Sequence, residues 1–176
     1  GIQYPILQGG MLWLANAALA AAVSNAGALG VISPYAGMKR HGDGLKNLVE
    51  QIKRIRDLTD KPFGVNIPLD LDQSGLLIDR LLQQDVEIAI TAAGSPALYT
   101  ELLKQAGIKV FHVISSVSQG RFSESCGVDG VISEGIEAAA HNGLAELPLF
   151  SLIPQVAESL SIPVIAAGGI VDARGV

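Results

Sequence analysis

The stretch Ser161-Ile-Pro-Val-Ile-Ala-Ala-Gly-Gly-Ile170 decides the fold, because an apolar run of strand-forming residues ends there in two glycines. Residues 131–143, Val-Ile-Ser-Glu-Gly-Ile-Glu-Ala-Ala-Ala-His-Asn-Gly, repeat the layout: a buried-looking strand, then small residues around one histidine. In α/β proteins such strand ends bring main-chain N–H groups close to a phosphate or a flat cofactor. Both stretches therefore indicate a ligand site at the carboxyl ends of a parallel sheet.

Short apolar runs alternate with helical patterns along the whole chain. We expect strands at Tyr4–Gln8, Leu29–Ser33, Phe63–Ile67, Ile88–Thr91, Val110–Ile114, Gly130–Ser133 and Val164–Ala166. We expect helices near Leu14–Asn25, Leu45–Leu58, Gly75–Gln84, Ala97–Gln105, Gln119–Ser125 and Leu152–Leu160. The strand cores are apolar on both faces, which favours parallel strands covered by helices.

Three helix-to-strand links share a glycine, Gly27, Gly107 and Gly127, where a helix needs a left-handed cap. Strand starts recur at about the length of one βα unit. Seven such units predict an α/β fold of the TIM (β/α)8 barrel type, incomplete because the eighth strand and later segments are absent. A doubly wound open sheet is the alternative. We expect residues 1–176 to form one domain, the N-terminal part of a longer chain.

The composition excludes several classes of protein. Of 176 residues, 49% are hydrophobic and 16% charged, which excludes disorder, and the net charge of −5 disfavours nucleic acid and acidic membranes as partners. Cys126 is the only cysteine, so no internal disulfide can form and a cytoplasmic location is expected. We expect Cys126 itself to be a small buried hydrophobic residue on a helix.

Several strand ends carry candidate ligand-binding residues. The glycines of Gln8-Gly9-Gly10-Met11 let main chain approach a ring, and Met11 can pack on an aromatic face, although a tight strand-to-helix turn explains the segment equally well. Asn66 ends the third expected strand with an amide that both donates and accepts, in a site or in a structural role. Ala93 and Gly94 end the fourth, and Ser95 is expected to cap the next helix.

The three histidines have different surroundings. His41 lies in a polar loop and is expected to be solvated, and His112 lies inside a strand, where a hydrogen-bonded structural role is expected. His141 follows the sixth expected strand, where an imidazole can donate a hydrogen bond or take a proton near neutral pH. The sequence shows no metal-ligand spacing, no nucleophile elbow and no dinucleotide or Walker motif.

Taken in order, six segments resemble the nitronate monooxygenase family, once called 2-nitropropane dioxygenases, which includes the FMN-dependent enoyl-acyl-carrier-protein reductase II. The segments are Tyr4-Pro-Ile-Leu-Gln-Gly-Gly-Met11, Ala26-Gly-Ala-Leu-Gly-Val31, Lys61-Pro-Phe-Gly-Val-Asn66, Ala93-Gly94, Glu134-Gly-Ile-Glu-Ala-Ala-Ala-His141 and Ile162-Pro-Val-Ile-Ala-Ala-Gly-Gly-Ile170. They run in the family's order and at compatible spacing across nearly the whole chain.

The resemblance implies FMN at the carboxyl rim of a TIM barrel. Gln8, Gly9, Gly10 and Met11 would line the isoalloxazine, Asn66 would contact the ring system, and Gln155 would reach the flavin or its ribityl chain. Gly168 and Gly169 would offer N–H groups to the phosphate, and Ala93, Gly94 and Ala167 would complete the cofactor-binding set. His141 would be the catalytic residue that polarises or deprotonates the substrate.

The leading activity implied is oxidation of nitronates or nitroalkanes with dioxygen. The alternative is reduction of an enoyl thioester in fatty acid synthesis, which would also require NAD(P)H. An inactive barrel kept as a binding module is the alternative of another class, because Ala139-Ala140 replace the usual Gly-Gly before His141. An IMP-dehydrogenase-like enzyme would need a loop cysteine, and Cys126 lies on an expected helix. A homodimer is left open.

Overall fold

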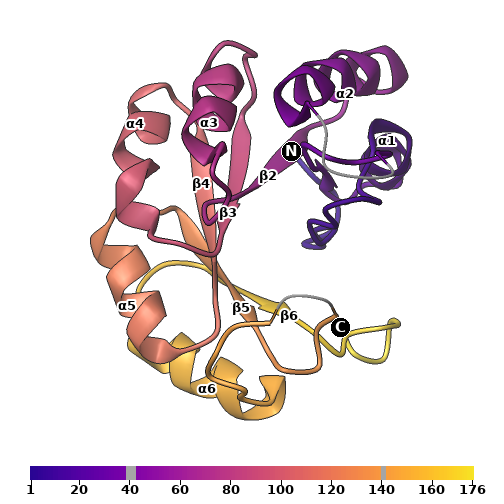
Figure 1. Cartoon of the computed structure of the whole chain (residues 1–176). Helices are drawn as coiled ribbons and strands as arrows, with labels where there is room; N and C mark the ends of the chain where they lie inside the picture. The colour runs from indigo at the N-terminus through magenta and orange to yellow at the C-terminus, as the bar shows by residue number, and fades with distance from the viewer. Residues whose placement is uncertain (39–42, 140–141) are drawn as a thin grey trace.

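The computed structural model describes residues 1–38, 43–139 and 142–176 (Figure 1). His41, Ala140 and the expected catalytic residue His141 lie outside the described residues. The helices are α1 (Ala17–Asn25), α2 (Gly44–Leu58), α3 (Ser74–Leu82), the 3-10 turn η1 (Pro96–Leu98), α4 (Thr100–Gln105), α5 (Val117–Ser125) and α6 (Leu149–Ser159). The strands are β1 (Gly30–Ile32), β2 (Phe63–Pro68), β3 (Ile88–Ala92), β4 (Lys109–Ile114), β5 (Gly130–Glu134) and β6 (Val164–Ala167).

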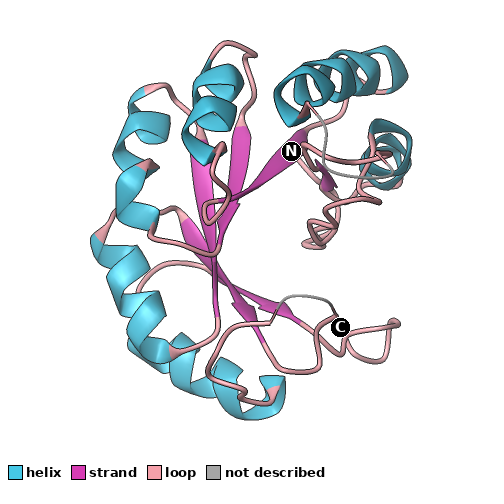
Figure 2. Cartoon of the chain, in the orientation of Figure 1, coloured by secondary structure: helices cyan, strands magenta, loops and turns pink. Residues whose placement is uncertain are grey.

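The described strands form one sheet of six parallel strands in the order β1-β2-β3-β4-β5-β6. A doubly wound sheet reverses its strand order part-way, so this sequential order contradicts that alternative. The sheet curves into a half-barrel with its helices on the outer side (Figure 2). The expected α/β class is therefore confirmed, and the half-barrel is consistent with an incomplete TIM barrel, with one strand fewer than expected among the described residues.

The missing strand is the first one, because Tyr4–Gln8 was expected to form a strand and does not. Only an isolated parallel bridge joins Leu7 to Leu29, with Leu29 N donating to Ile6 O and Gln8 N donating to Leu29 O. Pro5 has no N–H to offer a ladder, and Gln3 and Tyr4 both donate to Gly27 O instead. The segment therefore runs beside β1 without extending the sheet by a full strand.

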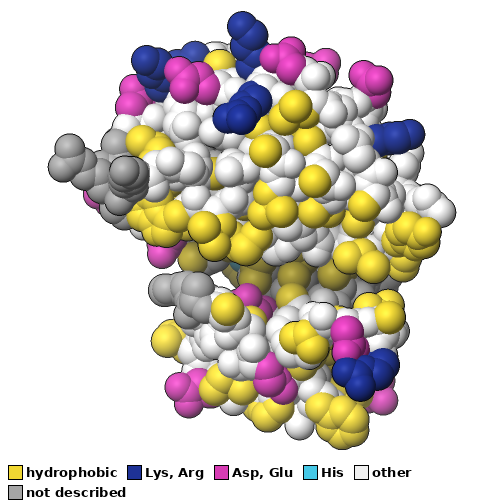
Figure 3. Space-filling model, turned by 90° about the vertical axis from the view of Figure 1, so that its right-hand side faces the viewer, with side chains coloured by type: hydrophobic (Ala, Val, Ile, Leu, Met, Phe, Trp, Pro, Cys, Tyr) yellow, Lys and Arg dark blue, Asp and Glu magenta, His cyan; other side chains and the backbone are white. Residues whose placement is uncertain are grey.

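The sheet separates two hydrophobic clusters. The larger one lies between strands and helices and includes Val65 and Ile67 of β2. The smaller one lies on the inner face and contains Leu29, Val31 and Ile90, with Leu7, Ile88, Phe111, Val113 and Ile132 packed against it. Because side chains alternate along a strand, Asn66 of β2 faces the inner side. Figure 3 looks onto the open side, where hydrophobic side chains border a hollow.

The helix ends follow their sequence signals in part. Gly27, Gly107 and Gly127 have φ of +95°, +80° and +83°, so the three expected left-handed caps are confirmed. Ser95 precedes η1 as expected but makes no side-chain capping bond. Cys126 caps the carboxyl end of α5 and is partly exposed, which corrects the expectation of a buried cysteine.

Among the described residues, no helix combines the length and the apolar character that crossing a membrane requires.

Candidate functional site

Residues 8–11, which follow the bridge between Leu7 and Leu29, lie against the inner face of β2. Gln8 is anchored to β1, because its Nε2 donates to Val31 O at 2.9 Å. Gly10 packs on Asn66: a Cβ at position 10 would lie 2.5 Å from Asn66 Oδ1 and 2.7 Å from Asn66 Cβ. Gly9 and Met11 are exposed beside this contact. The structure therefore brings the expected residues 8–11 and Asn66 together.

We call the edge of the sheet at the carboxyl ends of its strands the rim. Asn66 and the residues that follow β3 form the next part of this rim. Asn66 is buried, and its Nδ2 lies 3.4 Å from Ile90 O, a long hydrogen bond that holds the amide loosely. Ala93 and Gly94 both have positive φ, +54° and +60°. A residue with a Cβ is strained in this region by about 1–2 kcal/mol, and such strain concentrates at ligand sites.

Gly168 and Gly169 form a tight turn at the end of β6, directly after Ala167. Their φ values are +103° and +72°, which favour glycine. A Cβ on Gly168 would lie 2.9 Å from Ala138 N and 3.1 Å from Gly135 O, so the turn contacts the backbone of the loop after β5. Ala167 O accepts a hydrogen bond from Gly135 N at 2.9 Å. These two loops therefore present closely packed backbone at the same end of the sheet.

The described residues of the loop after β5 lie at the same end of the sheet, where Gly135 N donates to Ala167 O. His141 itself lies outside the described residues, but the residues beside it are anchored. Asn142 Nδ2 donates to Ile136 O at 3.0 Å, and Gly143 packs so closely on Ser115 that a side chain would collide with it. The described residues next to positions 140–141 are therefore held in place by the rest of the chain.

Gln155 lies apart from the other expected cofactor-binding residues. It is exposed on α6, and its Nε2 donates to Ser151 O of the same helix at 2.7 Å. Because α6 covers the outer side of the sheet (Figure 1), this arrangement does not bring Gln155 to the inner face.

His112 has the structural role expected from its strand position. It is buried on the outer side of the sheet, where Thr91 Oγ1 lies 2.7 Å from His112 Nδ1. Burial lowers the pKa of His112 to about 4, so the imidazole is neutral at physiological pH. It lines a cavity of about 130 Å³ together with Ala93 and Gly94, directly behind the rim.

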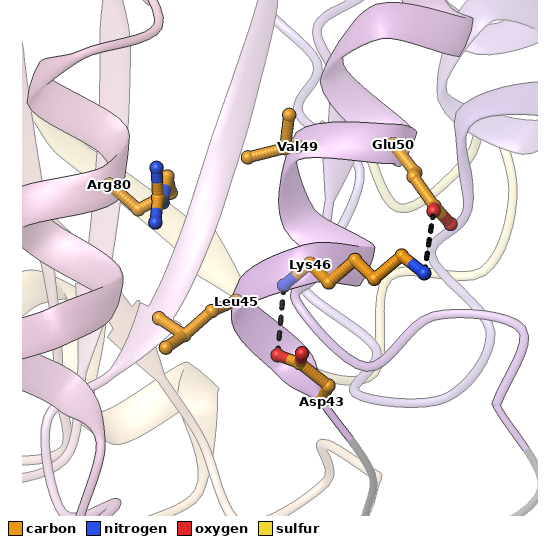
Figure 4. Close-up of a pocket in the computed structure, with 6 residues that line it drawn as sticks. All are labelled: Asp43, Leu45, Lys46, Val49, Glu50 and Arg80. Carbon is orange, nitrogen blue, oxygen red and sulfur yellow. Dashed lines mark hydrogen bonds and ion pairs between the residues drawn. The ribbon is translucent and has the colours of Figure 1, made fainter.

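A larger groove of about 450 Å³ lies elsewhere, between α2 and α3 on the outer side (Figure 4). Its charged side chains largely pair with their neighbours. Lys46 Nζ lies 3.9 Å from Glu50 Oε1, and Arg80 donates to Gln83 Oε1 at 3.1 Å. The residues that line the groove therefore form no cluster of like charge, and none of them belongs to the rim. Within the described ranges, no three histidine, cysteine, aspartate or glutamate residues lie together as a metal site.

Comparison with known sequences identifies the family. The sequence profile described as nitronate monooxygenase matches residues 1–77 and 74–176. The chain belongs to the nitronate monooxygenase family. The resemblance carried by the six sequence segments is thereby confirmed, and members of this family are oxidoreductases.

Three relatives of this family member cover almost its whole length. The (3aS,4S,5R,7aS)-5-hydroxy-7a-methyl-1-oxo-octahydro-1H-indene-4-carboxyl-CoA dehydrogenase of Rhodococcus jostii is 37% identical over 175 residues, 99% of this chain and 47% of the relative. A probable nitronate monooxygenase of Staphylococcus aureus is 32% identical over 222 residues, 99% of this chain and 60% of the relative. The structure of FabK from Thermotoga maritima superposes with a TM-score of 0.90 at 43% identity, over 99% of this chain and 53% of that one.

The chain spans about half the length of the curated relatives it matches. The alignments also differ in length. The alignment with the Staphylococcus aureus protein extends over 222 residues, more than the 176 of this chain, so that relative carries residues that this chain lacks within the aligned region. The Rhodococcus jostii alignment, over 175 residues, needs no such segment.

Proposed function

We propose that this chain belongs to an FMN-dependent oxidoreductase and supplies the surface on which the flavin lies. The observation that carries the proposal is the Gly168–Gly169 turn, where both φ values are positive and a Cβ on Gly168 would collide with backbone. Because these glycines carry no side chain, and Gly169 and Gly10 are exposed, main chain in the turn and beside Asn66 stays accessible to a phosphate or a flat ring. Both features fit FMN, the cofactor implied by the family resemblance.

Each group of residues would have one task. The backbone N–H groups of Gly168 and Gly169 would bind the phosphate, and Ala167 would hold that turn on the sheet. Gly9, Gly10 and Met11 would line the ring, with Gln8 anchoring them to β1 and Asn66 offering an amide. Ala93 and Gly94, at the end of the neighbouring strand β3, would shape the part of the rim next to Asn66. Bound FMN would supply the transfer of an electron pair to or from the substrate.

His141 is proposed as the residue that handles the proton. A neutral imidazole beside the flavin can donate a hydrogen bond to a substrate oxygen or take a proton from the carbon beside it. The support is the sequence motif together with the anchoring of Ile136 and Asn142 on either side of residues 140–141.

Two substrate classes are compatible with the site, and the comparisons favour an acyl thioester. The relative that aligns without extra residues is named as a dehydrogenase of a CoA thioester. The two parts of the family profile meet at residues 74–77, the start of α3, so we infer that the extra residues of the longer relatives enter there. In this chain only residues 69–73 connect β2 to α3, which would leave the rim beside Asn66 open to a bulky thioester arm.

Nitronate oxidation is the second candidate, supported by the family profile and by the Staphylococcus aureus relative. Steady-state assays of the intact protein separate the two. NAD(P)H oxidation that depends on a crotonyl thioester supports the reductase. Oxygen uptake with propyl nitronate and no nicotinamide supports the monooxygenase. An intact protein that binds no FMN would instead favour the inactive binding module.

A further inference from the structure

The loop between β5 and α6 is closed by a glutamate that reaches across it. Glu137 accepts a hydrogen bond from Leu149 N, with its two carboxylate oxygens at 3.1 and 2.9 Å. Leu149 is the first residue of α6, and the preceding Pro148 has no side-chain acceptor for the free N–H groups at this helix end. The carboxylate of Glu137 fills that role and places negative charge at the positive end of the helix dipole.

The same residue lies beside the glycine turn proposed to bind the phosphate, in a loop that is bonded to the end of β6 through Gly135 N and Ala167 O. A Cβ on Gly169 would lie 3.3 Å from Glu137 Cβ, and a Cβ on Gly168 would lie 2.9 Å from N of the next residue, Ala138. Glu137 therefore stands between the start of α6 and the end of β6. A side chain that only capped α6 would have no need to lie beside the Gly168–Gly169 turn. A capping residue next to Leu149 in the sequence would not reach across the loop between β5 and α6.

We propose that Glu137 is a positioning residue that couples the loop carrying His141 to the Gly168–Gly169 turn. Its bond to Leu149 fixes residue 137 relative to the start of α6, and its side chain borders the space beside Gly169. The inference rests on the proposed function, because the turn is taken to bind the FMN phosphate. It predicts that losing the bond harms phosphate recognition more than it harms recognition of the ring.

The test compares the affinities of the intact protein for FMN and for riboflavin, which lacks the phosphate. Glu137→Ala removes the acceptor, and Leu149→Pro removes the donor at a helix position that tolerates proline. Glu124→Ala is the matched control, because Glu124 Oε1 also accepts a backbone N–H, from Ser161 at 2.7 Å, in the connection that precedes β6. Melting temperatures are measured in parallel.

We expect Glu137→Ala and Leu149→Pro each to lower the ratio of FMN to riboflavin affinity about tenfold, as small misplacements of binding groups do. The double variant should be no worse than either single one, because both remove the same bond. Glu124→Ala should lower the melting temperature without changing the ratio.

Two results would overturn the inference, and they are distinguishable. A wild-type protein that binds neither flavin removes the proposed function and this inference with it. A wild-type protein that binds FMN, with an unchanged affinity ratio in the Glu137 variant, leaves the proposed function standing and reduces Glu137 to a helix cap. If Glu137→Ala does not fold, the ratio measured for Leu149→Pro decides in the same way.

Discussion

Gly10 and Asn66 lie in direct contact across the rim, 56 positions apart in the sequence, with no room between them for a Cβ at position 10. The contact joins the segment that follows the Leu7–Leu29 bridge to the inner face of β2. It explains how a glycine-rich stretch and a lone amide, each ambiguous in the sequence, come to form one surface.

Gly10→Ala should therefore displace the Asn66 amide and weaken FMN binding about tenfold, the effect of roughly 1–2 kcal/mol of overpacking. The matched comparison makes the same substitution in an Asn66→Ala background, because that variant lacks Cγ and Oδ1, the two atoms nearest to the added Cβ. Fluorescence titration of the intact protein with FMN measures the cost of Gly10→Ala in both backgrounds, and the cost should be smaller without the amide. An equal cost in both backgrounds would show that the Asn66 contact is irrelevant to the flavin.

Gly168→Ala should abolish tight FMN binding, because the new Cβ meets the backbone of Ala138 and Gly135 and cannot move aside. Gly127→Ala provides the control: its φ is also positive, +83°, but its Cβ would meet nothing within 4 Å. Both variants should lose about 1 kcal/mol of stability from backbone strain, and Gly168→Ala should lose more because of the collision. Only the first should lose FMN, and retention of FMN by Gly168→Ala would remove the turn from the cofactor site.

His112 should make the stability of the protein depend on pH. Its pKa is about 4 in the folded protein, against 6.5 for an unperturbed histidine, so the unfolded state gains a proton first as the pH falls. The free energy of unfolding is therefore unaffected by His112 above about pH 6.5, and it falls progressively as the pH is lowered toward 4. From about pH 7.5 to about pH 5 the loss should be roughly 2 kcal/mol. Urea unfolding of wild type and His112→Asn measures it; an equal loss in the variant would contradict this assignment.

His141→Ala should leave FMN bound and lower turnover at least about tenfold, the low end of what a general acid or base contributes. The visible absorption spectrum confirms retention of the cofactor, and steady-state kinetics with the preferred substrate give the rate. Unchanged turnover would remove His141 from the mechanism.

The sequence predicted features that depend on neighbouring residues alone. The left-handed caps at Gly27, Gly107 and Gly127 follow from local helix termination, and the apolar strand cores predicted parallel pairing. Predicted boundaries for β2 to β6 fall within one residue of those in the structure, because each strand is bounded by a turn or helix signal.

Features that depend on distant contacts could not be predicted in this way. The segment Tyr4–Gln8 has the pattern of a strand, yet Pro5 and the competing acceptor Gly27 O keep it from pairing fully. The contact of Gly10 with Asn66 and the bond from Leu149 to Glu137 both join residues that the sequence gives no reason to pair. In the sequence Glu137 is only one member of a motif, and its role depends on where α6 begins.

FMN content tests the central claim most directly. The intact protein should be yellow as purified, or become so on mixing with FMN, and should bind one FMN per chain with the absorption spectrum of a protein-bound flavin. A folded, intact protein that stays colourless and binds no FMN in excess would contradict it.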